Sequence, residues 1–167
     1  MIQKKVCMLG SFSVGKSSLV RRFIESIFDE KYHTTIGVKV DKKIVKLDGE
    51  DLTLVLWDIH GEDVFQKMRM TYLKGMSGYL LVVDPTRKQT LEDALSLKER
   101  VDEVMGKVPS VLVLNKCDLV AEWDIDLARI QAMQDRGQEV IRTSAKTGEG
   151  VEEAFSKLAG AMLEAAT

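Results

Sequence analysis

Cysteine, proline and histidine are scarce in this 167-residue sequence, each occurring only twice. Two cysteines, Cys7 and Cys117, are too few for a disulfide scaffold and are typical of a protein from a reducing compartment, so we expect free thiols. No Pro-rich, Gly-rich or repetitive stretch divides the chain. We therefore expect residues 1–167 to form a single domain.

A charge excess and long apolar runs are also absent. The 24 Lys and Arg residues nearly balance the 26 Asp and Glu residues, for a net charge of −2. Bulk attraction to nucleic acid or to an anionic membrane requires a large basic excess. The longest apolar runs, such as residues 78–83, are too short to span a bilayer, and no signal-peptide core begins the chain. The composition predicts a cytoplasmic protein that binds no nucleic acid.

Short apolar segments rich in Val, Leu and Ile predict six β-strands. They cover residues 5–9, 38–47, 52–58, 79–84, 111–115 and 139–142. Several are apolar at every position, which is typical of strands that are buried on both faces of a parallel sheet. The second and third segments differ, because Asp48-Gly49 between them predicts an antiparallel hairpin.

Apolar residues at helical spacing occupy the segments between these strands. They predict helices over residues 16–25, 91–105, 124–135 and, most regularly, from 151 onwards. The alternation predicts an α/β fold, a mostly parallel six-stranded sheet with one antiparallel edge strand and helices on both faces. Ligands of such folds bind at the carboxyl ends of the strands.

The predicted strand 38–47 carries four lysines, Lys39, Lys42, Lys43 and Lys46. Lysines on a strand often protect an exposed sheet edge against aggregation, and we favour this interpretation. The alternative is a basic recognition surface.

Residues 10–17, Gly-Ser-Phe-Ser-Val-Gly-Lys-Ser, match the phosphate-loop pattern G-x-x-x-x-G-K-[ST] between a predicted strand and a predicted helix. Glycines let backbone N–H groups approach triphosphate oxygens, and the helix N-terminus adds a favourable dipole. Lys16 is expected to neutralise the β- and γ-phosphates, and the Ser17 hydroxyl to bind Mg²⁺. The residues expected to bind the phosphates are Gly10, Ser13, Val14, Gly15, Lys16, Ser17 and Ser18.

Two further motifs follow predicted strands, Asn115-Lys116-Cys117-Asp118 and Thr143-Ser144-Ala145-Lys146. With them, the chain from Lys4 to Leu163 resembles the Ras superfamily of small GTPases. The resemblance implies that Asp118 accepts hydrogen bonds from guanine, that Lys116 packs along the base, and that the Ala145 N–H contacts the guanine carbonyl. The other base-binding residues that it implies are Phe28, Asn115, Leu119, Ser144 and Lys146.

The resemblance also assigns two switch segments. Residues 32–37 are similar to switch I, with Thr35 as a second Mg²⁺ ligand, and their Thr-Ile-Gly is Rab-like. Residues 57–62 are similar to switch II, where Asp58 would hold Mg²⁺ through water and the Gly61 N–H would contact the γ-phosphate. Loss of that phosphate releases both loops in GTPases. Effector, exchange-factor and activating proteins are expected to bind the two switches.

Glu62 stands where most of the family has the glutamine that orients the attacking water. We expect slow GTP hydrolysis without a partner, with Lys16, Thr35, His60, Gly61 and Glu62 as the catalytic set. One alternative is a GTP-binding adaptor that does not hydrolyse. A more distant alternative is an ATP phosphotransferase, against which the Asn115 to Asp118 motif argues.

Three other positions depart from the family pattern, which are His60 after the third predicted strand and Phe12 and Ser13 in the phosphate loop. His60 replaces a small residue, and with His33 it suggests a pH switch, although solvated loop histidines are the favoured interpretation. The Phe12 ring either obstructs an activator's arginine or points away from it. Ile2 in place of glycine, and the absence of a cysteine near residue 167, predict that this chain carries no direct lipid anchor.

Overall fold

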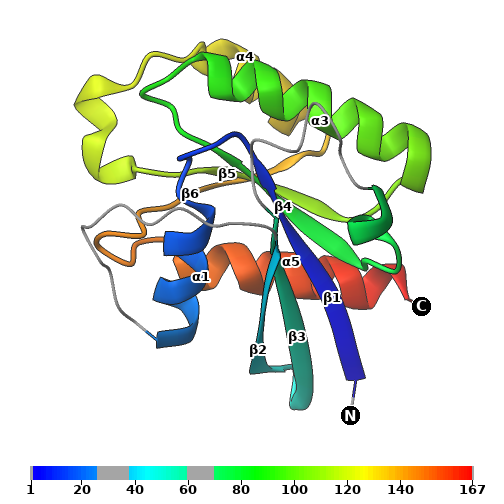
Figure 1. Cartoon of the computed structure of the whole chain (residues 1–167). Coiled ribbons are helices and arrows are strands. Elements are labelled where there is room, and N and C mark those ends of the chain that lie inside the picture. The colour runs from blue at the N-terminus through cyan, green and yellow to red at the C-terminus, as the bar shows by residue number, and fades with distance from the viewer. Residues whose placement is uncertain (1, 26–37, 60–69, 167) are drawn as a thin grey trace.

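The computed structural model describes residues 2–25, 38–59 and 70–166. It contains a six-stranded sheet in the order β2-β3-β1-β4-β5-β6 (Figure 1). The strands are β1 (Ile2–Gly10), β2 (Val38–Leu47), β3 (Glu50–Ile59), β4 (Gly78–Val83), β5 (Ser110–Leu114) and β6 (Glu139–Arg142). Only β2 runs antiparallel to its neighbour, and the other four pairings are parallel. This confirms the predicted sheet with its antiparallel edge.

Helices cover both faces of the sheet, as predicted: α1 and α5 lie on one face, α3 and α4 on the other (Figure 1). Their bounds are α1 (Lys16–Glu25), α3 (Gln89–Met105), α4 (Leu127–Asp135) and α5 (Val151–Ala165). Two short 3₁₀ helices, η1 (Met70–Leu73) and η2 (Cys117–Glu122), were not predicted. Helix α4 begins three residues later than predicted, because the Asp126 carboxylate caps it by accepting bonds from the Ala128 and Arg129 amides.

The central strands contain uniformly apolar stretches, such as residues 6–9 of β1 and 80–83 of β4, because both faces of the sheet are covered there. In β1, Val6 and Met8 pack in the cluster with α1 and α5, whereas Cys7 and Leu9 pack in the cluster with α3 and α4. All four side chains are fully buried. The alternation of side chains along a strand thus divides one apolar segment between two hydrophobic cores.

The predicted hairpin is confirmed, with a two-residue turn between Leu47 and Glu50. Asp48 and Gly49 both have positive φ angles, 51° and 82°, which the primed turns of tight hairpins require. The turn chemistry therefore fixes the register of β2 against β3.

Strand β2 is an edge strand, and three of its lysines, Lys39, Lys42 and Lys46, are exposed as edge protection requires. Lys43 differs, because its ammonium donates to the Phe23 carbonyl and lies 4.1 Å from the centroid of the Phe23 ring. Lys43 therefore packs the strand against α1.

Both cysteines are free in the structure, as predicted, with Cys7 buried and Cys117 partly buried. Over the described ranges, no helix is both long enough and apolar enough to cross a membrane.

Removal of the Phe155 ring should weaken the contact between α1 and α5. The rings of Phe23 and Phe155 stack with centroids 3.9 Å apart, and both are almost fully buried. We expect Phe155→Ala to lower the free energy of unfolding by about 3–5 kcal/mol, because it leaves a cavity in the core. Urea unfolding followed by circular dichroism measures this. A loss no larger than that of Val104→Ala, at an exposed α3 position, would contradict the packing described.

Candidate functional site

The motif residues meet at one edge of the sheet, where β1, β4, β5 and β6 end. Gly10 ends β1, and Asp84, Asn115 and Thr143 each follow directly after a strand. Backbone hydrogen bonds continue the sheet past these ends, from the Asn115 amide to the Val83 carbonyl and from the Thr143 amide to the Leu114 carbonyl, both at 2.9 Å. This is the edge at which open α/β sheets bind their ligands.

The phosphate loop passes between β1 and α1 as predicted. Gly15 has a φ angle of 104°, and a Cβ atom there would lie only 2.3 Å from the Asn115 side-chain nitrogen. Glycine is therefore required by both the backbone conformation and the close approach. Val14 is buried in the core beside this glycine and anchors the loop to the sheet.

Asn115 connects the loop to two strands. Its Nδ2 donates to the Val14 carbonyl at 2.9 Å, and its Oδ1 accepts a bond from the Thr143 hydroxyl at 3.0 Å. Only 2% of Asn115 is exposed. The side chain of Asn115, the only asparagine in the sequence, thus links the phosphate loop to the ends of β5 and β6.

The Lys16 ammonium lies inside the phosphate loop, where it donates to the Gly10 and Ser11 carbonyls, each at 3.1 Å. Burial lowers the pKa of Lys16 to about 8, although the negative charge of Asp58 acts to raise it. A buried ammonium whose partners among the described residues are two carbonyl groups is well placed to bind an anion.

Ser17 and Asp58, two residues that were predicted to hold Mg²⁺, lie together in the structure. The Ser17 hydroxyl donates to Asp58 Oδ2, while Oδ1 is buried and has no hydrogen-bond partner among the described residues. Burial raises the pKa of Asp58, although the bond from Ser17 acts against this. A hydroxyl beside a buried carboxylate fits Mg²⁺, a hard cation that binds few protein ligands and accepts the rest from substrate and water. No group of three His, Cys, Asp or Glu residues within 2–25, 38–59 and 70–166 would hold a metal alone.

The two predicted base motifs meet at the ends of β5 and β6. The Ser144 hydroxyl donates to Asp118 Oδ1 at 2.8 Å and accepts a bond from the Thr147 amide at 3.0 Å. Ser144 is fully buried, whereas Asp118 is exposed. The buried hydroxyl therefore orients a carboxylate that solvent, or a ligand, can reach. Nearby, the Ala145 carbonyl accepts a bond from Arg22 Nε of α1 at 2.8 Å.

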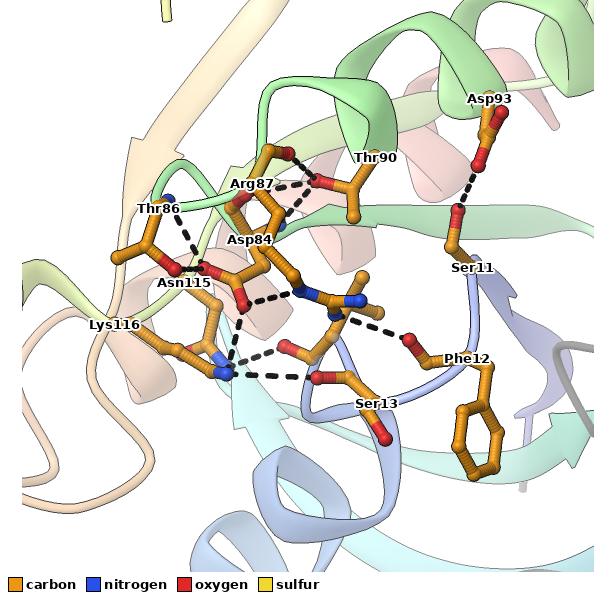
Figure 2. A network of polar contacts seen from close by, with 11 residues as sticks. Ser11, Phe12, Ser13, Asp84, Thr86, Arg87, Thr90, Asp93, Asn115 and Lys116 are labelled. Atoms are coloured by element: carbon orange, nitrogen blue, oxygen red, sulfur yellow. Dashed lines mark hydrogen bonds and ion pairs between the residues drawn. The ribbon is translucent and has the colours of Figure 1, made fainter. Parts of the chain in front are cut away.

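Asp84 is a site residue that the sequence analysis did not identify. It is 1% exposed, and its Oδ2 accepts bonds from Lys116 Nζ at 2.8 Å and from Arg87 Nε at 3.0 Å (Figure 2). Burial alone would raise the pKa of Asp84, but bonds from Lys116, Thr86 and Arg87 outweigh it and lower the pKa. The sequence feature that could have identified Asp84 is its position, as an acidic residue directly after a strand that is apolar throughout.

Other predicted residues take less central positions. Ser18 lies in the first turn of α1, and Leu119 and Lys146 are exposed beside Asp118 and Ala145. The Phe12 ring points away from Asp84 and Lys116 (Figure 2). The predicted residues Phe28, His33, Thr35, His60, Gly61 and Glu62 lie outside the described residues.

Comparison with known proteins identifies the family. The sequence model of the Ras family matches residues 5–164. The chain belongs to the Ras family. It is 32% identical to the Ras-related protein Rab-32C of Dictyostelium discoideum, over 98% of this chain and 75% of that protein. It is also 33% identical to the GTP-binding protein ypt2 of Schizosaccharomyces pombe, over 93% of this chain and 78% of the relative.

Membership of the Ras family, with relatives of the Rab type, makes this chain a GTP-binding molecular switch. Ras and Rab proteins are GTPases that bind GTP or GDP together with Mg²⁺, and they act through regulatory and effector proteins. The phosphate loop and the Ser17–Asp58 pair have the chemistry that such ligands need.

The thiol of Cys117, within the Asn115 to Asp118 motif, should react slowly at neutral pH. Burial and the bond to Glu149, 3.1 Å from Sγ, raise the pKa of Cys117 to about 11. Because the thiolate is the reactive form, we expect iodoacetamide labelling to accelerate about tenfold per pH unit between pH 8 and 10. Mass spectrometry of the Cys117 peptide measures the rate.

Glu149→Gln should raise the Cys117 labelling rate at pH 8, since it removes the charge that opposes thiolate formation. A labelling rate that is independent of pH, or unchanged in this variant, would contradict the assigned cause.

Proposed function

We propose that this chain hydrolyses GTP to GDP and phosphate at the carboxyl edge of its sheet, slowly in the absence of a partner. The observation that carries the proposal is the meeting of a buried Lys16 ammonium with the Ser17–Asp58 pair, at the same sheet edge as the Ser144–Asp118 pair. The first group suits a triphosphate with its cation, and the second suits a guanine base.

In the proposed reaction, water attacks the γ-phosphorus and the bond to the β–γ bridging oxygen breaks, so that GDP leaves with the electron pair. Lys16 stabilises the negative charge that develops on the phosphate oxygens. Ser17 and Asp58, with Thr35 assigned by resemblance, would hold Mg²⁺, which neutralises charge on the β- and γ-phosphates when bound. The Thr35 carbonyl would place the water, with Glu62 or His60 assisting.

Guanine selectivity is assigned to Asp118. An exposed carboxylate that Ser144 orients accepts hydrogen bonds from the ring N–H and the exocyclic amine of guanine. Adenine does not offer that pair of donors in the same orientation, so the carboxylate would be left desolvated and unpaired against it.

A second candidate function is a GTP-binding adaptor that does not hydrolyse its nucleotide. Glu62, His60 and Phe12 all depart from the family pattern near the reacting phosphate, whereas the binding motifs are intact. A carboxylate at position 62 accepts a proton from water but cannot donate as an amide does. In either case we propose that effector, exchange-factor and activating proteins bind residues 32–37 and 57–62.

Single-turnover hydrolysis separates the two candidates. The protein is loaded with stoichiometric GTP and Mg²⁺, and GDP and phosphate are followed by chromatography. We expect slow accumulation of GDP, and none with Lys16→Ala, because the charge on the phosphates is then uncompensated. Lys107→Ala, which removes an exposed lysine at the far end of α3, serves as the control for charge.

Bound GTP that stays uncleaved would overturn the GTPase proposal and leave the adaptor. If GDP does accumulate, Glu62→Gln tests the unusual residue. An unchanged rate in that variant would remove Glu62 from the mechanism.

Asp118→Ala should abolish base selectivity. We expect the ratio of GTP to ATP affinity to fall roughly 100-fold, about 3 kcal/mol, since two hydrogen bonds to a charged acceptor are lost. Competition between the two nucleotides, measured by equilibrium binding, gives the ratio. Glu122→Ala removes an exposed carboxylate from the same 3₁₀ helix and should leave the ratio intact. Equal ratios for Asp118→Ala and the wild type would refute this assignment.

A further inference from the structure

Three successive carbonyl groups of the phosphate loop are held by side chains from other elements. The Phe12 carbonyl accepts a bond from Arg87 Nη2 at 3.0 Å, and the Ser13 carbonyl lies 3.5 Å from Lys116 Nζ (Figure 2). The Val14 carbonyl accepts a bond from Asn115 Nδ2 at 2.9 Å. Arg87 follows β4, whereas Lys116 and Asn115 follow β5. Side chains that follow β4 and β5 thus orient the backbone carbonyl groups of residues 12, 13 and 14 in the loop.

The direction of each carbonyl determines the direction of the next amide. The peptide bonds of the described residues are all trans, and the C=O and N–H of a planar trans peptide point to opposite sides. Carbonyls 12, 13 and 14 point towards Arg87, Lys116 and Asn115. The N–H groups of Ser13, Val14 and Gly15 therefore point to the other side of the loop, and together they form a set of donors for anionic oxygens.

Ser13 is the residue of this loop whose backbone most needs support. Its φ angle is 62°, in the left-handed region that a side chain disfavours, at a cost of about 1 kcal/mol or more. The two peptide groups that flank it are those of the Phe12 and Ser13 carbonyls, which Arg87 and Lys116 hold. These two cations therefore act on both sides of the strained residue.

Asp84 fixes both of these cations. The same carboxylate oxygen, Oδ2, accepts from Arg87 Nε and from Lys116 Nζ, while Oδ1 accepts from the Thr86 amide and hydroxyl (Figure 2). Arg87 donates to Asp84 through Nε and to the Phe12 carbonyl through Nη2. The planar fork of the guanidinium holds these two donors in a fixed geometry, so one side chain can make both bonds. A lysine at this position would have one point charge and no such fork.

We propose that Arg87 is a positioning residue for nucleotide binding: it holds the Phe12 carbonyl outward, so that the Ser13 N–H is directed at the nucleotide phosphates and the bound nucleotide is retained for longer. The inference rests on the nucleotide site assigned under the proposed function. It concerns binding alone and requires no contact between Arg87 and the nucleotide.

The test is the rate at which fluorescently labelled GDP leaves the Mg²⁺-loaded protein into excess unlabelled GDP. We expect release from Arg87→Ala to be about tenfold faster than from the wild type, which corresponds to about 1.4 kcal/mol. Arg87→Lys keeps the charge but not the fork, and should release GDP nearly as fast as Arg87→Ala. Lys88→Ala removes the exposed positive charge next along the chain and should match the wild type.

A spectroscopic measurement separates positioning from general destabilisation. In the GDP-bound wild type, the Ser13 amide proton should resonate downfield, as expected for a hydrogen bond to phosphate. In Arg87→Lys the downfield shift of the Ser13 amide proton should diminish. The chemical shift of the Gly15 amide proton should not change, because the bond from Asn115 to the Val14 carbonyl orients that amide. The Gly15 signal is an internal control, so the comparison holds even where Arg87→Ala folds poorly.

Four results would overturn the inference. Release rates within twofold of each other in all four proteins would show that Arg87 does not act on retention. A wild-type rate in Arg87→Lys would assign the effect to charge alone, and an unmoved Ser13 amide would exclude the orientation. If the wild type does not retain labelled GDP at all, the nucleotide site itself fails, and this inference fails with it.

Discussion

The side-chain amide of Asn115 is the interaction on which the rest of the site depends. It joins the phosphate loop after β1 to the end of β5 and, through Thr143, to the end of β6. These segments come from distant parts of the chain, and the residue that joins them is buried. Loss of one partner would leave polar groups unpaired in the interior. The free-energy cost of an unpaired buried group exceeds the net stabilisation that the hydrogen bond provides.

Most of the fold followed from the sequence because the controlling signals are local. Uniformly apolar strands predicted a sheet that is covered on both faces, and Asp48-Gly49 predicted the hairpin. The 3₁₀ helix η2 was not predicted, because a bond to a distant segment holds its start: the Cys117 amide donates to the Thr143 carbonyl at 2.9 Å, and Lys116 before it has a left-handed φ angle of 63°. No periodicity encodes such a segment.

The position of a candidate-site residue was predictable wherever a motif assigns chemistry to a residue type, as for Lys16, Ser17 and Asp118. It was not predictable where a side chain acts through the backbone of another segment. Arg87 resembles any exposed arginine at the start of a helix, and Asp84 any acid at the end of a strand, until the structure brings both to the loop. Residues that orient binding groups have no spacing rule, since the contacts arise from the packing of β4 against β1 and β5.

The sharing of Asp84 Oδ2 between Arg87 and Lys116 has an energetic consequence. Each cation partly neutralises the carboxylate that orients the other, so their contributions are coupled and do not add. A substitution of Arg87 therefore changes the energetic contribution of Lys116, which lies far along the chain after the next strand. Divergence at position 87 therefore alters the stability of the side chain at position 116, and divergence at position 116 does the same to Arg87.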